Sequence, residues 1–490
     1  MRRIGIFLLA LMALGCAREE RIAIDVFFTA DVEGFYYSRQ EPRLDNQVAG
    51  GYGVLKNFLQ SVTTPFLLFD GGNWFGSGAE GTLSKGSYVP LLTQDIPFTA
   101  GTITDKDLIY GWPVARNIVK QLKYPLVVTN MRMENQIPWP LHDYQIRTVE
   151  GIKIGIFGII APLEKDQSRL SGLYTLDPVE TAQKMAAMLR EKGVDYIIVL
   201  STLDFSGQGN AALASEVEGI NLILSSNQDN ETPETEEING TWIVYPGAKL
   251  DSLGKISLQF DKQSHQLKDT AFTDLPLLKS MYGEDETIEK QAAELLSQTR
   301  KNMKRFIAKT TREISTKLDE QSPLGSLLIQ CLHRWAKLDG AILNAASIRA
   351  SLPQGDLTEF DLYKAYPYGD NITYVTIKGA ALAKALQASL NMNDNFPQIA
   401  GFSVMYMDTS MGKKIMRITL DNGRIVRPNE TYRIAVTDHV LAGGFGHDEF
   451  INALEFKSTF VEARQIMRSC LARQKTVVVP EYQHRWKLIK

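Results

Sequence analysis

The sequence predicts a layered α/β protein with more than one domain, and three observations support this fold class. Short β-branched apolar runs alternate with helical patterns between residues 22 and 275, as is typical of layered α/β folds. The 490 residues suffice for two large domains or three smaller ones. A hydrophobic content of 44% with a formal charge of −3 excludes disordered, collagen-like and disulfide-stabilised miniprotein classes.

The charge balance also limits the partners. The chain has 53 basic and 56 acidic side chains and no long basic run. Binding to a phosphate backbone needs a concentrated positive surface, so a nucleic-acid polymer is not expected as a partner. A small molecule is the expected ligand.

Residues 1–15 are predicted to be a secretion signal, because Arg2 and Arg3 precede an apolar run that is too short to span a bilayer. The run ends in Ala13-Leu14-Gly15-Cys16, which resembles the bacterial lipobox, where the cysteine is lipidated and becomes the mature N-terminus. We therefore expect export to the periplasm or cell surface, with a lipid on Cys16 as the only membrane contact. Position 17 is Ala and not Asp, which resembles the enteric sorting signal for the outer membrane, so we expect the lipid anchor there. A soluble export signal followed by an incidental cysteine is the alternative.

Cys331 and Cys470 lie in apolar, helix-like surroundings. Free cysteine behaves there as a small hydrophobe, so two buried thiols are favoured. A disulfide in an oxidising compartment is the alternative, because the sequence contains no distance between them.

Six apolar runs are the expected strands of the first domain, and most of them end in polar residues. The runs are 22–28, 66–69, 125–128, 152–160, 196–200 and 222–224. Ligands of open α/β sheets gather at the carboxyl ends of strands. The polar segments that follow these runs are therefore the candidate site: 30–33, 70–73, Asn130, 201–204 and 226–230.

An amphipathic helix over 281–307 is the predicted interdomain linker. Apolar residues repeat at three- and four-residue spacing from Ile288 to Met303, after an acidic first turn and before a basic end. Ser322 and Pro323 then start a second helix that is expected to stop near Gly340. The predicted domains are thus 16–280 and 308–490.

Several common chemistries are excluded by counting. Of six histidines, His142 and His265 precede the linker, and both lie outside the polar strand ends, which excludes a histidine-rich zinc site there. No Gly-x-Ser-x-Gly nucleophile elbow occurs, and the glycine-rich segment 76–81 lacks the lysine of a P-loop.

The polar segments, taken in order, resemble the bacterial 5′-nucleotidase family over nearly all of the mature chain. The matching motifs are Thr29-Ala30-Asp31-Val32-Glu33-Gly34, Gly50-Gly51-Tyr52, Asp70-Gly71-Gly72-Asn73, Asn130, Asn344-Ala345-Ala346-Ser347-Ile348-Arg349, Pro367-Tyr368-Gly369-Asp370 and Gly443-Gly444-Phe445-Gly446. This resemblance implies an N-terminal calcineurin-like metallophosphoesterase domain, a layered β-sandwich flanked by helices. A long helix would join it to a C-terminal α/β nucleotidase-type domain.

The resemblance implies a two-metal phosphoester hydrolase, but the metal motifs depart from the family. Asp31-Val32-Glu33 replaces Asp-x-His, and Gly72-Asn73 replaces Gly-Asp. Lys106, in Thr104-Asp105-Lys106-Asp107, occupies the position of a transition-state histidine. The later family histidines map to Thr202, Asn227 and Asp229.

These replacements predict a degenerate metal centre. The candidate ligands share oxygen donors, which suit Mg²⁺, Mn²⁺ or Ca²⁺; they are Asp31, Glu33, Asn73, Asp105 and Asp229. Two-metal catalysis usually needs a bridging carboxylate, which Asn73 is not, and Lys106 would repel cations. A site without metal is favoured over a repurposed oxygen-ligand site. Loop capping, or ion pairs with Lys106, is the non-functional explanation of these carboxylates.

The C-terminal motifs follow the family more closely. The resemblance implies that Asn344 and Arg349 contact a nucleotide and its phosphates, and that Tyr368 stacks on the base. Ala345, Ala346, Asp370, Val440 and Phe445 depart from the pattern, and Val440 replaces the second stacking aromatic. Losing one stack would weaken binding by about 1–3 kcal/mol. A structural ion pair of Arg349 and core packing of Tyr368 are the alternatives.

The predicted function is therefore a cell-envelope member of this family that is non-catalytic or much weakened. It would bind a small nucleotide or phosphate-bearing ligand, or an envelope protein. The alternative is an active phosphoester hydrolase of 5′-nucleotidase type, in nucleotide catabolism, with oxygen-ligated Mg²⁺, Mn²⁺ or Ca²⁺. Family relatives that hydrolyse carrier-bound sulfur compounds suggest a third function, which no residue here positively indicates.

Overall fold

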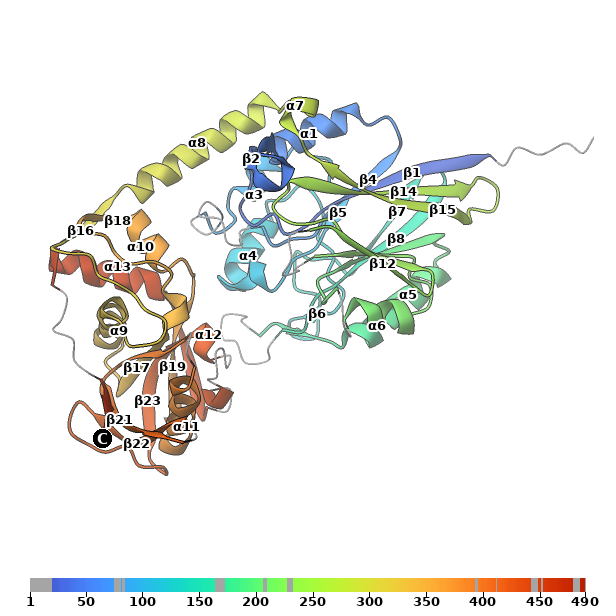
Figure 1. Cartoon of the computed structure of the whole chain (residues 1–490). Helices are drawn as coiled ribbons and strands as arrows, with labels where there is room; N and C mark the ends of the chain where they lie inside the picture. Colours follow the sequence, from blue (N-terminus) through green and yellow to red (C-terminus); the bar gives the residue numbers. More distant parts are fainter. Residues whose placement is uncertain are drawn as a thin grey trace, which may run out of the picture.

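Two β-sheets pack face to face in the N-terminal part of the chain (Figure 1). The computed structural model describes residues 20–74, 81, 84–163, 172–205, 209–226, 232–392, 395–410, 412–441, 448–450, 453–478 and 485–489. The first sheet has the order β15 (Leu267–Pro276), β14 (Ser252–Asp261), β1 (Arg21–Thr29), β4 (Phe66–Asp70) and β5 (Ala100–Gly101). The second has the order β12 (Glu234–Ile238), β13 (Thr241–Tyr245), β11 (Leu222–Ser225), β10 (Tyr196–Ser201), β8 (Ile152–Ile159) and β7 (Tyr144–Val149).

Alternation along β1 explains the layers. Ile24, Val26 and Phe28 point into the core between the two sheets, whereas Phe27 packs on the opposite face against Phe58 of α1 (Tyr52–Ser61). Helices therefore cover the outer face of the first sheet, among them α3 (Val89–Leu92) and α4 (Trp112–Val119). On the second sheet the helices are α5 (Pro178–Glu191) and α6 (Asn210–Glu216). Two short two-stranded sheets complete this domain: β2 (Arg39–Glu41) with β3 (Gln47–Ala49), and β6 (Met131–Arg132) with β9 (Tyr174–Thr175).

Five of the six predicted strands form as expected. The run at 125–128 instead makes isolated bridges, from Leu126 to Gly101 and from Val127 to His142. It still runs parallel to β5, so its end contributes Asn130 to the same edge of the sheet.

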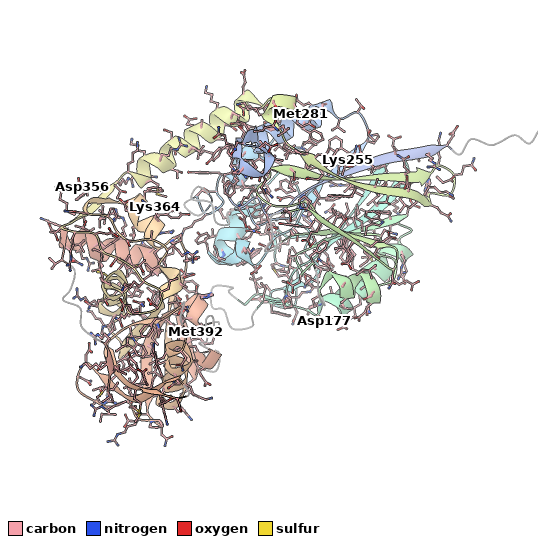
Figure 2. The ribbon with its side chains drawn as sticks, in the orientation of Figure 1. Asp177, Lys255, Met281, Asp356, Lys364 and Met392 are labelled. Carbon is pink, nitrogen blue, oxygen red and sulfur yellow. A yellow bond between two sulfur atoms is a disulfide. The ribbon has the colours of Figure 1, made fainter. Side chains whose placement is uncertain are left out.

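Helix α8 (Glu286–Met303) connects the two parts of the molecule (Figure 1). The side chain of Asp285 caps its first turn, and Ile288 and Ala292 pack into the core next to α1. Figure 2 shows Met281, on the short α7 (Lys279–Tyr282), near one end of α8, and Asp356 and Lys364 near the other end.

The C-terminal part has a central sheet with the order β20 (Pro397–Ala400), β17 (Gly340–Asn344), β23 (Thr431–Thr437), β19 (Asn371–Lys378) and β24 (Glu455–Glu462). Leu343 of β17 packs against α9 (Pro323–Ala336), α10 (Glu359–Ala365) and α13 (Ala463–Gln474), whereas Ile342 faces α11 (Gly379–Leu390). Two smaller sheets have the orders β18 (Gly355–Thr358), β16 (Phe306–Thr310), β25 (Thr476–Val477) and β22 (Gly412–Leu420), β21 (Phe402–Thr409), β26 (Trp486–Leu488). The predicted fold class is confirmed.

Two expectations about α9 need correction. The favoured prediction of two free thiols is wrong, because Cys331 of α9 and Cys470 of α13 form a disulfide with Cα atoms 5.7 Å apart. Helix α9 also ends at Ala336, before Gly340, because Lys337 adopts the left-handed conformation with φ 53°. Gly340 instead begins β17, where a Cβ would lie 2.4 Å from the ring of Phe402.

Candidate functional site

The polar strand ends of both sheets meet at one edge of the N-terminal domain. Strands β1 and β4 are parallel, and Thr29 pairs with Asp70, so the loops that follow leave side by side. The hydroxyl of Ser226, just after β11 in the second sheet, donates a 2.8 Å hydrogen bond to the carbonyl of Gly71. The topology thus brings together segments that are 155 residues apart in the chain.

Three candidate residues at this edge have left-handed backbones. The φ angles are 46° at Asp31, 52° at Glu33 and 54° at Asn73. Residues with a Cβ seldom adopt this conformation, and such strain concentrates at functional sites. The loops therefore retain a shape that directs these three side chains toward one another.

The amide of Asn73 joins the two acidic side chains. Its Nδ2 donates to Asp31 Oδ1 at 2.7 Å and lies 3.5 Å from Glu33 Oε1. Asp31 and Asn73 are fully buried. The other amide atom, Asn73 Oδ1, is buried without a hydrogen-bond partner among the described residues.

Asp107 holds the Asn73 loop in place, a role that sequence reasoning missed. Its carboxylate accepts the backbone N–H groups of Asn73 at 2.7 Å, Trp74 at 2.8 Å and Thr104 at 2.9 Å. Burial raises the pKa of Asp107 to about 7, although these donors favour its charged form. The usable signal was an acidic residue directly after Lys106, within the motif already identified.

Asp70 is also committed to structure. It accepts hydrogen bonds from the indole N–H of Trp74 at 2.8 Å, from the hydroxyl of Tyr124, and from the backbone N–H of Gly72 at 3.1 Å. Burial raises its pKa. Both carboxylate oxygens of Asp70 are therefore occupied by hydrogen bonds that hold the 70–74 loop and Tyr124 in place.

The remaining candidate ligands do not complete a cation cage in the described part of the chain. Asp105 and Lys106 are half-buried beside the short 3₁₀ turn Lys106–Leu108. The hydroxyl of Thr202 accepts the backbone N–H of Ala161 at 2.9 Å. Asp229, with Asn227, lies outside the described residues, as do the predicted signal at 1–15 and Cys16.

The described donors are an incomplete set for a two-metal cluster. Among the described residues, no group of three His, Cys, Asp or Glu side chains is placed to hold a metal ion. Two cations need anionic oxygens between them. The central group here is the amide of Asn73, which aims N–H donors at Asp31 and Glu33.

The second candidate site lies in the C-terminal domain. Arg349 is exposed, and its backbone N–H donates to the carbonyl of Ala365 at 2.9 Å, three residues before Tyr368. Its guanidinium lies 3.4 Å from the carbonyl of Ala346, and no carboxylate pairs with it among the described residues. Asn344 is buried at the end of β17. The structure thus places the three predicted ligand residues on neighbouring segments.

Tyr368 supplies the exposed aromatic ring of this site among the described residues. Tyr368 is 41% exposed and meets Tyr366 edge to face, with ring centroids 6.0 Å apart, so core packing does not account for it. The hydroxyl of Tyr366 donates to Asp370 at 2.8 Å. Val440 is fully buried and offers no second face. Phe445 lies outside the described residues.

The model of the 5′-nucleotidase C-terminal domain family matches residues 301–454. Endonuclease YhcR of Bacillus subtilis is 23% identical over 86% of this chain and 37% of its own length. Protein UshA of Yersinia enterocolitica is 22% identical over 77% of each chain. Cell wall protein Lmo0130 of Listeria monocytogenes is 22% identical over 82% of this chain and 61% of its own. The chain thus spans well under half of the first of these relatives.

The fold is shared with solved structures. The 5′-nucleotidase precursor from Thermus thermophilus superposes with a TM-score of 0.64 at 19% identity, covering 96% of this chain and 99% of that one. At this identity the likeness shows a shared fold, and the family match itself covers residues 301–454. Within the described part of the chain, no helix is long and apolar enough to cross a bilayer.

Proposed function

The C-terminal part of this chain belongs to the 5′-nucleotidase C-terminal domain family, and from this premise we propose a cell-envelope ligand-binding protein without two-metal phosphoesterase activity. The observation that carries the proposal is the amide of Asn73, whose Nδ2 donates to Asp31 at 2.7 Å. The amide stands where a bridging carboxylate would be needed.

The amide of Asn73 and a metal ion would compete for the same carboxylate lone pairs. A carboxylate oxygen that accepts a short hydrogen bond from an amide has that lone pair directed at the donor. A neutral amide also leaves the buried site one negative charge short of the family pattern, which weakens attraction for divalent cations. Lys106, one residue after Asp105, adds a positive charge in the same segment. Each of these effects disfavours a pair of metal ions.

The C-terminal domain supports binding of a phosphate-bearing ligand. Arg349 presents an exposed guanidinium whose planar donors suit bidentate contact with phosphate. Tyr368 offers an exposed aromatic ring on an adjacent loop. A nucleotide matches this pair, with its phosphate at Arg349 and its base on Tyr368. An envelope protein that covers the same residues is the competing partner.

The disulfide supports the proposed location. Structural disulfides persist in oxidising compartments outside the cytosol, and Cys331–Cys470 closes a loop of 139 residues. Together with the lipobox-like segment that ends at Cys16, this favours an exported protein held at the membrane by a lipid.

One observation favours a second candidate, a single oxygen-ligated cation. Asn73 Oδ1 is buried without a partner among the described residues, which is costly for an amide oxygen. A half-turn of the amide would direct this oxygen toward Asp31 and Glu33, and a hard cation would then have to lie between the three groups. Such a site would support hydrolysis only by a different route from the two-metal one.

Metal analysis with parallel binding and turnover assays separates the two candidates. The mature protein is stripped with chelator, refilled with Mg²⁺, Mn²⁺, Ca²⁺ or Zn²⁺, and assayed for bound metal, 5′-AMP hydrolysis and 5′-AMP binding. We expect the protein to bind 5′-AMP without hydrolysing it, and we expect Arg349→Ala to abolish this binding. Stoichiometric metal with turnover that Asp31→Ala abolishes would overturn the proposal and establish the hydrolase.

A further inference from the structure

An aromatic residue of the N-terminal domain contacts the loop that carries the C-terminal candidate site. Tyr110 lies three residues after Asp107, and its ring lies on the backbone of Gly369. A Cβ at Gly369 would stand 2.5 Å from Cε1 and 3.0 Å from the hydroxyl oxygen of Tyr110. Gly369 directly follows Tyr368, so the ring abuts the loop that carries the proposed stacking residue.

An ion pair reinforces this contact. Lys85 Nζ lies 4.9 Å from the centre of the Tyr110 ring and forms an ion pair with Glu462, at the end of β24. The side chain of Glu462 is 14% exposed and that of Lys85 is 44% exposed, so the pair is shielded from solvent on the Glu462 side. The N-terminal domain therefore contacts the C-terminal domain at two adjacent points, Tyr110 with Gly369 and Lys85 with Glu462.

Glu462 is in turn connected to the Tyr368 loop. Its other oxygen lies 3.7 Å from Arg464, whose guanidinium donates to the carbonyls of Tyr366, at 3.3 Å, and Pro367, at 2.7 Å. The backbone N–H of Ala463 donates to the carbonyl of Asp370 at 2.8 Å. The loop 366–370 is thus held by the first residues of α13 and contacted by Tyr110.

We infer that Tyr110 and Lys85 are positioning residues for the 366–370 loop, so that binding of an aromatic ligand on Tyr368 depends on the N-terminal domain. The inference rests on the proposed ligand site. It assigns the altered N-terminal centre a mechanical role, because the Asp107 carboxylate that organises Asn73 and Trp74 also anchors the segment leading to Tyr110. By linkage, the ligand would stabilise the interdomain contact by the same free energy.

A clash-and-rescue experiment tests the contact. Gly369→Ala places a methyl group against Tyr110, and Gly369 does not need a left-handed backbone. We expect this variant to weaken 5′-AMP binding about tenfold, the effect of misplacing one stacking ring, and to leave inorganic phosphate binding at Arg349 unchanged. In a Tyr110→Ala background the three atoms nearest to the new methyl group are gone, so Gly369→Ala should have much less further effect. An equal effect in both backgrounds would overturn the inference.

The ion pair is tested by charge exchange. Lys85→Glu and Glu462→Lys should each weaken 5′-AMP binding severalfold, and the double exchange should restore part of the loss. Lys384→Glu is the matched control, because Lys384 forms an exposed ion pair with Glu449 within the C-terminal domain. A control variant that weakens binding as much as Lys85→Glu would count against a specific role.

Hydrogen exchange of residues 366–370 keeps the inference separate from the proposed ligand. If the native protein binds neither 5′-AMP nor phosphate, the proposed function fails. The positioning role still predicts that the amides of this loop exchange faster in Gly369→Ala than in the native protein. In the Tyr110→Ala background, adding Gly369→Ala should leave the exchange rate of the loop unchanged. Identical exchange in all variants would contradict it.

Discussion

Replacing Asn73 with aspartate is the sharpest test of the proposal that the amide at this position disfavours a pair of metal ions. The substitution would turn the Nδ2 donor, 2.7 Å from Asp31 and 3.5 Å from Glu33, into a carboxylate oxygen. Two carboxylate charges about 4 Å apart repel by about 4 kcal/mol at an effective dielectric of 20. The new carboxylate can instead share a proton with its acidic neighbour. Protonation at pH 7 of a carboxyl group with an ordinary pKa of about 3.9 costs about 4 kcal/mol, so the destabilisation is similar either way.

This magnitude is easily measured. For a domain of this size 1 kcal/mol shifts Tm by about 2–4 °C, so Asn73→Asp should lower Tm by about 8–16 °C in EDTA at pH 7. At pH 5 the proton is shared at lower cost and the loss should shrink to about 1–2 kcal/mol. A divalent ion at 100 times its Kd should restore about 2.7 kcal/mol.

Scanning fluorimetry with EDTA, Mg²⁺ and Mn²⁺ measures each of these effects. Asn130→Asp is the matched control, because Asn130 is an equally buried asparagine whose amide is fully bonded to the backbone of Ile160. Its variant should lose stability without metal-dependent recovery. Two results would refute the reasoning: no loss of Tm in EDTA for Asn73→Asp, or the same metal response from the native protein.

Three further predictions concern stability. Reducing Cys331–Cys470, or replacing both residues with serine, should lower the free energy of unfolding of the C-terminal domain by up to about 5 kcal/mol, from the closed loop of 139 residues; an unchanged Tm with reductant would contradict this. Burial and neighbouring carboxylates raise the pKa of Glu289 from 4.5 to about 7, so its contribution to stability is present below pH 4.5 and lost as the pH rises through 7. Native Tm should therefore fall between pH 5 and 8, and Glu289→Gln should flatten that fall; parallel profiles would refute the assignment. Tyr124→Phe removes the hydroxyl that donates to the buried Asp70 and should lower the free energy of unfolding in urea by about 1–3 kcal/mol. The buried hydroxyl of Tyr196 has no partner among the described residues, so Tyr196→Phe should lower it by almost nothing.

The sequence predicts individual strands and helix starts well, because their signals lie in neighbouring residues. The apolar runs of β1 and β4 and the cap at Ser322 depend on neighbouring residues, and the structure has each of them. The end of α9 was misplaced because a glycine signal was interpreted as a stop. Gly340 is small because Phe402 approaches it from another strand, which no local pattern reveals.

Periodicity and the side chains at the strand ends were enough to predict the fold class and the chemical type of each site residue, and the motifs carried the resemblance to a family. Tertiary structure alone decided which of those residues meet. It paired Cys331 with Cys470 across 139 residues, directed the amide of Asn73 onto Asp31, and set Tyr110 of one domain against Gly369 of the other. Each of these contacts depends on distances between remote segments, which are fixed only when the sheets and helices pack.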